Sequence, residues 1–199
     1  LTREQTVYLE RAYSGIGRLT SILGKISEAR RLEESLDEEE ELSFNLAEVV
    51  KGCVRGYEIA FPDYEFSTSI EADPIQVTGI PELIAQLLDK LVNNAVEFSH
   101  PQDTIKVRLT VDKKQAVLRV INSGIELPRA SESQLFDSML SVRESDDKQD
   151  VDHLGLGLYI ARVITEFHGG SIHAANREDT RGVIITVVIP LMRITSKLR

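Results

Sequence analysis

The chain has 199 residues, of which 42% are hydrophobic and 28% are charged, a composition that fits one or two soluble domains with a real core. Its formal charge of −9 excludes a general nucleic-acid binder, which would carry a basic stripe, but is compatible with a local basic pocket for a phosphate ligand. The single cysteine, Cys53, excludes an intrachain disulfide, and the longest apolar run, residues 183–189, is β-branched and predicts a buried strand rather than a membrane span.

Residues 2–36 are predicted to form one long helix of the kind found in helical bundles. Leu9, Ile16 and Leu23 repeat every seven residues, and further apolar rows lie beside them. The apolar face is therefore wider than the seam of a two-stranded coiled coil. One helix cannot bury such a face alone, so we expect partner helices from upstream sequence or from another chain.

An acidic run, residues 33–41, closes this helix and is interpreted as a solvated helix end and linker. It predicts two parts, residues 1–41 and a larger domain over residues 42–199. Because the chain begins at Leu1 rather than at a methionine, we expect it to be a piece of a longer protein.

The larger domain alternates between helical and strand patterns. Strands are predicted at residues 42–45, 64–70, 75–78, 104–111, 115–121, 171–175 and 183–189, and helices at 46–59, 81–98, 131–142 and 155–167. The turn at Asp112-Lys113-Lys114 joins two alternating segments into a hairpin. This order predicts an α+β fold, a two-layer α/β sandwich with a mixed sheet and helices on one of its faces.

A glycine turn, Gly155-Leu156-Gly157-Leu158, opens the last predicted helix. Glycine lets a backbone approach a ligand closely, and the unpaired N–H groups at the start of a helix bind anions. The turn therefore predicts a phosphate cradle, with an ordinary turn as the alternative. A polar stretch before it, residues 143–152, is interpreted as part of a lid, or alternatively as a surface loop.

Four segments taken together resemble the catalytic ATP-binding domain of bacterial sensor histidine kinases, which has the Bergerat ATP-binding fold. They are residues 86–99, similar to the asparagine box; 122–128, similar to the first glycine box; 135–139, similar to the phenylalanine box; and the glycine turn. Their order and spacing agree with that family over about residues 42–192. The resemblance implies ATP and Mg²⁺ as cofactors.

The long first helix is similar to the second helix of the same family's dimerisation and phosphoacceptor hairpin. The resemblance therefore implies a homodimer through this helix in the intact protein. The first helix of the hairpin normally carries the phosphorylated histidine. The four histidines here, His100, His153, His168 and His173, all lie in the ATP-binding part, so we expect the acceptor upstream of Leu1.

The resemblance also implies roles for individual residues. Asn94 holds the position of the Mg²⁺ ligand, Asn122 replaces the aspartate that contacts the adenine amine, and Arg143 is either a lid contact to the triphosphate or a solvated side chain. The expected nucleotide-binding residues are Asn94, Phe98, Asn122, Gly124, Gly155, Leu156, Gly157, Leu158 and Thr186.

One departure from the family pattern lies on the asparagine-box helix. The family has an asparagine four residues before the Mg²⁺ ligand and a basic residue three after it, whereas this chain has Lys90 and Glu97. Lys90, Asn94 and Glu97 share one helix face. We hypothesise that Lys90 contacts a phosphate, so that Asn94 and Lys90 are the candidate catalytic residues; the alternative is that Lys90 pairs with a surface carboxylate.

Lys90 also bears on the reaction type. Related ATPases such as gyrase and chaperones use a glutamate at this offset as general base, and a charged lysine cannot take that role. We therefore expect a kinase rather than an ATP hydrolase. The expected activity is transfer of the γ-phosphoryl group to a histidine and then to an aspartate on a response-regulator receiver domain.

The expected setting is the cytoplasmic domain of an inner-membrane-anchored bacterial protein, with no membrane contact by this chain and no nucleic-acid partner. Lys90 and Asn122 also resemble residues of kinases paired with dedicated sortase systems in proteobacteria. Two alternatives stay open. One is a pseudokinase or nucleotide-gated scaffold, supported by Lys90, Glu97, Asn122 and Glu126, and the other is a purely structural module.

Overall fold

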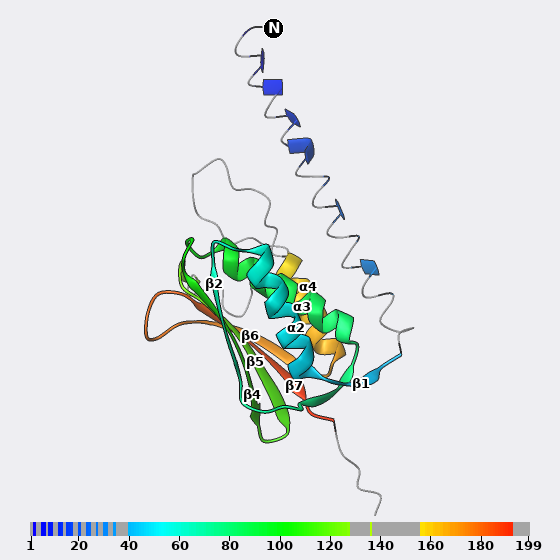
Figure 1. Ribbon diagram of the computed structural model, residues 1–199. Coiled ribbons are helices and arrows are strands. Elements are labelled where there is room, and N and C mark those ends of the chain that lie inside the picture. Colours follow the sequence, from blue (N-terminus) through cyan, green and yellow to red (C-terminus); the bar gives the residue numbers. More distant parts are fainter. Residues whose placement is uncertain are drawn as a thin grey trace, which may run out of the picture.

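The computed structural model describes residues 40–127, 136 and 156–192 together with scattered residues between 2 and 34, and for Leu156 only the backbone. A five-stranded mixed sheet forms one layer, and helices cover one of its faces as the second layer (Figure 1). This confirms the α+β two-layer sandwich. No helix in the described part of the chain is long and apolar enough to cross a membrane.

The elements follow the predicted order, each within one residue of its predicted bounds. They are β1 (Leu42–Asn45), α2 (Leu46–Ala60), β2 (Glu65–Ile70), β3 (Gln76–Gly79), α3 (Pro81–Glu97), β4 (Thr104–Asp112), β5 (Gln115–Asn122), α4 (Leu156–Phe167), β6 (Ser171–Asn176) and β7 (Val183–Pro190). The described residues between 5 and 34 are helical, as expected of the first helix. The helix predicted at residues 131–142 lies outside the described residues, apart from Phe136.

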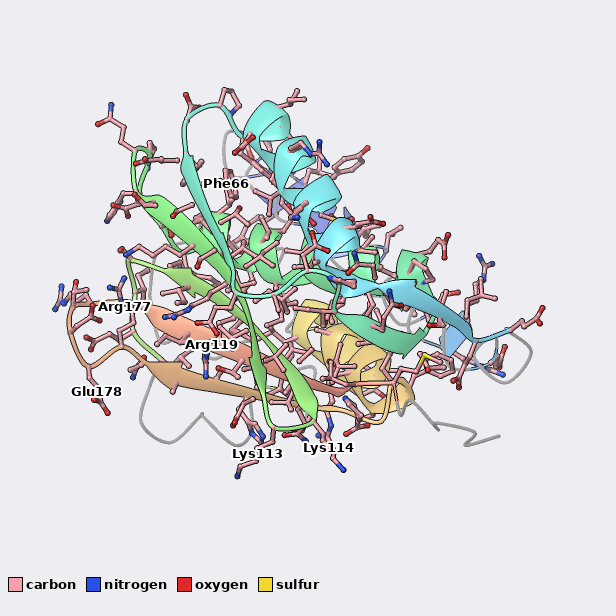
Figure 2. The ribbon with its side chains drawn as sticks, turned by 60° about the horizontal axis from the view of Figure 1, so that its bottom comes forward. Phe66, Lys113, Lys114, Arg119, Arg177 and Glu178 are labelled. Atoms are coloured by element: carbon pink, nitrogen blue, oxygen red, sulfur yellow. The ribbon has the colours of Figure 1, made fainter. Side chains whose placement is uncertain are left out.

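The sheet has the strand order β2-β4-β5-β7-β6. Only the β2–β4 pair is parallel, and β4 and β5 form the predicted hairpin, with Lys113 at a positive φ of 57° and Lys114 beside it in the turn (Figure 2). The short strands β1 and β3 lie outside this sheet and pair antiparallel with each other.

The core lies between the helices and the inner face of the sheet. On α3 the buried side chains recur every three or four residues, which is the spacing of one helix face: Ile84, Leu87, Leu88, Leu91, Val92 and Ala95. On β5 and β7 every second residue is buried against them. Burial of each large aliphatic side chain contributes about 1.5–3 kcal/mol to folding. Phe66 of β2 packs beneath α2, with its ring 6.1 Å from that of Tyr57 (Figure 2).

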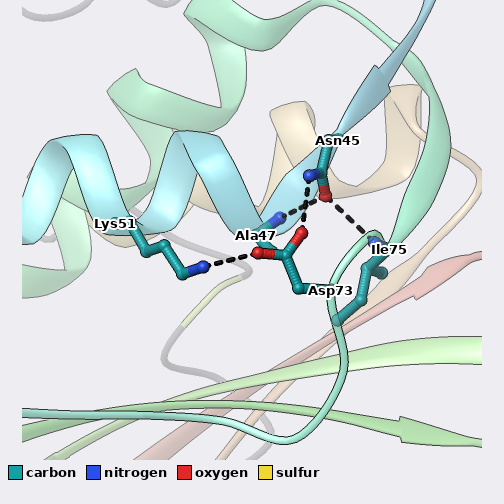
Figure 3. Close-up of polar contacts among 5 residues, drawn as sticks. All are labelled: Asn45, Ala47, Lys51, Asp73 and Ile75. Carbon is teal, nitrogen blue, oxygen red and sulfur yellow. Dashed lines mark hydrogen bonds and ion pairs between the residues drawn. The ribbon is translucent and has the colours of Figure 1, made fainter.

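A polar cluster fixes the start of α2 (Figure 3). The side-chain oxygen of Asn45 accepts hydrogen bonds from the backbone N–H groups of Ala47 (3.2 Å) and Ile75 (2.9 Å). Its nitrogen donates to Asp73 (2.8 Å), which also binds Lys51 (2.5 Å), and these two contacts lower the pKa of Asp73, the one from Lys51 more strongly. An N-cap of this kind stabilises a helix by about 1 kcal/mol.

His168 joins the end of α4 to the start of α3. The backbone N–H of Ile80 donates to Nε2 of His168 (3.2 Å), so Nε2 must be an acceptor. The proton is then on Nδ1, which donates to the carbonyl of Ile164 (2.7 Å). Burial lowers the pKa of His168 and favours this neutral form. Because the last turn of α4 meets the first turn of α3, the two helices run antiparallel (Figure 1).

Candidate functional site

The end of α3 meets the segment that follows β5. Asn122, the last residue of β5, is only 5% exposed, and its side-chain nitrogen donates to Oγ of Ser99 (3.3 Å) and to the carbonyl of Ser123 (3.3 Å). The backbone N–H of Ile125 donates to the carbonyl of Phe98 (3.4 Å). The structure thus brings together two predicted motifs that lie well apart in the sequence.

Gly124 is required by this contact. Its φ is +141°, and a Cβ atom there would lie 1.9 Å from the carbonyl oxygen of Phe98. Gly182 meets a similar requirement, with φ +137° and a Cβ position 2.0 Å from the carbonyl oxygen of Asn122. Only glycine fits so close to another backbone at positive φ. Three backbone segments therefore touch around Asn122.

Two residues that the sequence did not single out hold the segment after β5. Asn176, at the end of β6, accepts a hydrogen bond from the N–H of Leu127 (2.6 Å) and donates one to its carbonyl (2.8 Å). Arg177 donates from Nη1 to Oγ of Ser123 (3.3 Å). No local motif marks either residue, since their role depends on which segment the β6 end meets.

Arg177 is itself held in place. Its guanidinium makes two hydrogen bonds to Asp179, from Nε at 3.0 Å and from Nη2 at 2.8 Å, and its side chain is only 8% exposed. The hydrogen bond to Asp179 raises the pKa of Arg177, so the group is charged at every physiological pH. A guanidinium that is itself held by Asp179 therefore supports Ser123, the neighbour of Asn122.

The antiparallel packing also relates the start of α4 to the later turns of α3. From the His168–Ile80 contact, Lys90 lies ten residues along α3 and Gly157 lies eleven residues back along α4. At the rise of an α-helix both positions are about 15–17 Å from that contact. The first N–H groups of α4 therefore lie level with the turn of α3 that carries Lys90, and Asn94 follows one turn further on; both side chains are half-buried.

No described residue lies close enough to Gly157 to require a glycine there. A Cβ atom there would meet nothing within 4 Å, at least among the described residues, and its φ is not in the left-handed region. A helical glycine costs up to about 1 kcal/mol relative to alanine. Open space beside the free N–H groups of a helix start fits a phosphate, which is bound there in many proteins.

The donor set also fits a magnesium ion that is held mainly by its nucleotide. Within the described part of the chain, no three His, Cys, Asp or Glu side chains are placed to hold a metal. The amide oxygen of Asn94 is a hard ligand of the kind Mg²⁺ prefers, and Mg²⁺ takes most of its other ligands from phosphates and water. Lys90 and Glu97 on the same face each make an interaction of their own, so neither is a free charge.

Thr186 is not brought to this site. On β7 the side chains of Val183, Ile185 and Val187 are buried towards the helices, so Thr186 points to the opposite face, where it pairs with Arg119 and His173. Asn122 faces the helices, and the residue directly across from it on β7 is Val183. The expected adenine contact by Thr186 is therefore corrected: the strand register puts it on the wrong face.

Several expected site residues fall outside the described residues: Gly155, Arg143 and the rest of residues 143–152, the polar stretch interpreted as part of a lid. Leu156 opens α4 and Leu158 is buried there. Phe136, from the predicted phenylalanine box, is buried beside a groove of about 510 Å³. The groove is lined by residues of β6 and the second half of α4, away from the start of that helix, so it is separate from the site above.

The chain matches a family model and a known relative. The family model described as "histidine kinase-, DNA gyrase B-, and HSP90-like ATPase" matches residues 79–193. The chain is similar to the signal transduction histidine-protein kinase ArlS of Staphylococcus aureus (strain USA300), with 28% identity over 127 residues, which cover 64% of this chain and 28% of ArlS. The chain thus spans less than a third of the length of this curated relative.

Two of the solved structures that it resembles are of the histidine kinase ThkA. The catalytic domain of ThkA is 28% identical, with a TM-score of 0.63 over 76% of this chain and 96% of that one. ThkA in complex with the response regulator protein TrrA is 25% identical, with a TM-score of 0.69 over 96% of this chain and 53% of that one. Both share the two-layer fold described above.

Proposed function

The chain belongs to the histidine kinase-, DNA gyrase B- and HSP90-like ATPase family, as an ATP-binding catalytic domain of the histidine kinase type, and from this we propose how the whole protein acts. It binds Mg·ATP and transfers the γ-phosphoryl group to a histidine outside this chain, from which an aspartate of a response regulator takes it. The observation that carries the proposal is the meeting of the end of α3 with the Asn122–Gly124 segment, beside an α4 that runs antiparallel to α3.

Phosphoryl transfer requires positioning and compensation of the triphosphate charge more than covalent chemistry by the protein. In the proposed site the amide oxygen of Asn94 is a ligand of Mg²⁺, which when bound neutralises phosphate charge. The N–H groups at Gly157 and Leu158 and the ammonium of Lys90 bind phosphate oxygens. Asn122 accepts a hydrogen bond from the adenine amine. Phe98 and Gly124 shape the wall of the base site.

The choice of kinase over ATP hydrolase rests on Lys90. A hydrolase needs a general base at this position to activate water, and a lysine at neutral pH has no free lone pair to take a proton. Apart from the sequence departures at Lys90, Glu97, Asn122 and Glu126, no contact among the described residues favours the alternative of a nucleotide-gated scaffold.

The partners and setting are part of the same proposal. A receiver domain as partner is supported by the likeness to ThkA, whose structure was solved with TrrA. A homodimer through residues 2–36 is supported by exposed apolar side chains there, such as Tyr13 (83% exposed) and Leu23 (66%).

The boundary between the two proposed parts, at residues 41 and 42, is supported by the start of β1 at Leu42. The cytoplasmic, inner-membrane-anchored setting rests on the type of relative, and membership of the sortase-linked kinases rests on Lys90 and Asn122 alone.

The direct test uses γ-labelled ATP and the chain extended at its N-terminus by its natural upstream sequence. Label on a histidine of the extended protein, followed by its transfer to an isolated receiver domain, is the expected result. Mg·ATP binding without any label on protein would instead favour the scaffold, and absence of Mg-dependent nucleotide binding would favour a structural module.

Replacing Lys90 by alanine is expected to weaken Mg·ATP binding by roughly 10- to 100-fold, because a charge-assisted hydrogen bond to phosphate contributes about 1.5–3 kcal/mol. Isothermal titration calorimetry measures the dissociation constant. The matched control is Lys114→Ala, which removes the same charge from the β4–β5 turn (Figure 2) and is expected to leave binding unchanged. An unaltered dissociation constant for Lys90→Ala rules out the phosphate contact.

Gly157→Ala is expected to stabilise the fold and to weaken the binding of Mg·ATP. The free energy of unfolding without nucleotide rises by a few tenths to about 1 kcal/mol, since alanine favours helix and its Cβ meets open space. Mg·ATP affinity falls by roughly tenfold or more, because the methyl group occupies the space for phosphate. Gly56→Ala on α2, which also meets nothing within 4 Å, is expected to stabilise without changing affinity. Equal affinity for wild type and Gly157→Ala contradicts the phosphate cradle.

A further inference from the structure

The orientation of the Asn122 amide decides which purine the site prefers. An aspartate at this position only accepts hydrogen bonds, whereas an asparagine accepts through its oxygen and donates through its nitrogen. A 6-amino purine such as adenine offers a donor at its 6-position, and a 6-oxo purine such as guanine offers an acceptor. An amide that turns freely would therefore pair with either base.

One neighbour of Asn122 favours one of the two orientations of its amide. The side-chain nitrogen lies 3.3 Å from the carbonyl oxygen of Ser123. A carbonyl oxygen can only accept, so the group that faces it must be the donor nitrogen. Turning the amide over would place two oxygens against each other at a residue that is only 5% exposed.

The second neighbour is Ser99, just beyond the end of α3. Its hydroxyl donates to the carbonyl of Ala95 (2.7 Å), so its hydrogen is already in use. Towards Asn122 the same oxygen therefore acts as an acceptor, and it receives the second hydrogen of the amide at 3.3 Å. Both donor hydrogens of Asn122 are thereby engaged, and its oxygen is the atom left for a ligand.

We propose that Ser99 is a specificity-determining residue, which together with the Ser123 carbonyl holds Asn122 as a hydrogen-bond acceptor so that the site selects 6-amino over 6-oxo purine nucleotides. This rests on the proposed function, in which Asn122 faces the base. Ser99 acts through Asn122 and is thus a positioning residue. With both amide hydrogens engaged in this way, Asn122 accepts a hydrogen bond as the aspartate that it replaces would.

The test compares Mg·ATP and Mg·GTP binding by calorimetry in wild type and Ser99→Ala. Wild type is expected to prefer ATP by at least about tenfold. Ser99→Ala frees one amide hydrogen, and the ATP-to-GTP preference is expected to narrow by roughly three- to tenfold, the effect of one net hydrogen bond. Ser99→Thr keeps the hydroxyl and is expected to keep the preference.

Two further variants separate selectivity from stability. Thr165→Val removes a hydroxyl that makes the same kind of bond, to the carbonyl of Ala161 (2.7 Å), but on α4, and is expected to leave the preference unchanged. Adding Asn122→Asp to Ser99→Ala is expected to restore the preference, because a carboxylate cannot donate.

An unchanged preference in Ser99→Ala, or an equal loss in Ser99→Thr, overturns the role of Ser99 while ATP binding by the wild type still supports the proposed function. Failure of the wild type to bind either nucleotide overturns the proposed function itself.

Discussion

Replacing Asn94 by alanine is expected to lower the rate of phosphoryl transfer by roughly 100- to 1,000-fold, the effect of removing one group that stabilises charge in a transition state. The reason is the small number of ligands that the protein offers. Within the described residues no three His, Cys, Asp or Glu side chains are placed to hold a metal, so in the proposed site the ion depends on the Asn94 oxygen and on the phosphates. A metal held mainly by phosphates is poorly placed once that oxygen is gone.

The measurement is the initial rate of histidine labelling by the N-terminally extended protein across a range of Mg²⁺ concentrations. The matched control is Asn93→Ala on the same helix. Asn93 is exposed and donates to the backbone carbonyl of Asp89 (2.7 Å), so its loss is expected to change the rate by less than about threefold. A rate in Asn94→Ala within a few-fold of wild type at saturating Mg²⁺ would remove Asn94 from the site.

Gly124→Ala is expected to lower the free energy of unfolding by about 3 kcal/mol and to abolish nucleotide binding. Two costs combine at this position. A side chain at φ +141° is strained by about 1–3 kcal/mol, and the new Cβ would lie 1.9 Å from the Phe98 carbonyl, so the backbone must shift. That shift separates the end of α3 from the segment that carries Asn122.

Urea denaturation without nucleotide measures the free energy of unfolding, and calorimetry measures the dissociation constant of Mg·ATP. Gly52→Ala serves as the control, since its Cβ meets nothing within 4 Å on α2 and is expected to stabilise slightly. A stability loss below about 1 kcal/mol in Gly124→Ala would mean that the Phe98–Gly124 contact is not kept in solution.

The hydrogen bonds around Asn122 explain why an asparagine can take the place of the usual aspartate. Asn122 is held by Ser99 and Ser123, Ser123 by Arg177, and Arg177 by Asp179. The direction of each hydrogen bond is set by a group that can only donate or only accept or, at Ser99, by the bond that its hydroxyl already donates to the Ala95 carbonyl. Such a chain positions the amide oxygen without the charge that an aspartate brings.

The sequence by itself determined the elements and the order of the motifs, because these depend on local patterns. The apolar spacing along α3 identifies one helix face whatever that face packs against, and the alternation on either side of Lys113 predicts the β4–β5 hairpin. The roles expected of Asn94 and Asn122 are what the resemblance to the histidine kinase family implies, whereas Gly157 belongs to a glycine turn that the sequence itself places before a helix.

Only the tertiary structure decided which of these residues meet. Thr186 matches a motif by its position in the chain, but the register of β7 against β5 turns it away from Asn122, because successive side chains of a strand point to opposite faces. Ser99, Asn176 and Arg177 carry no motif, and their contacts to Asn122, Leu127 and Ser123 exist only because distant backbone segments are brought within hydrogen-bond distance. A local pattern records the periodicity of one element, whereas register and amide orientation depend on the partner that the element meets.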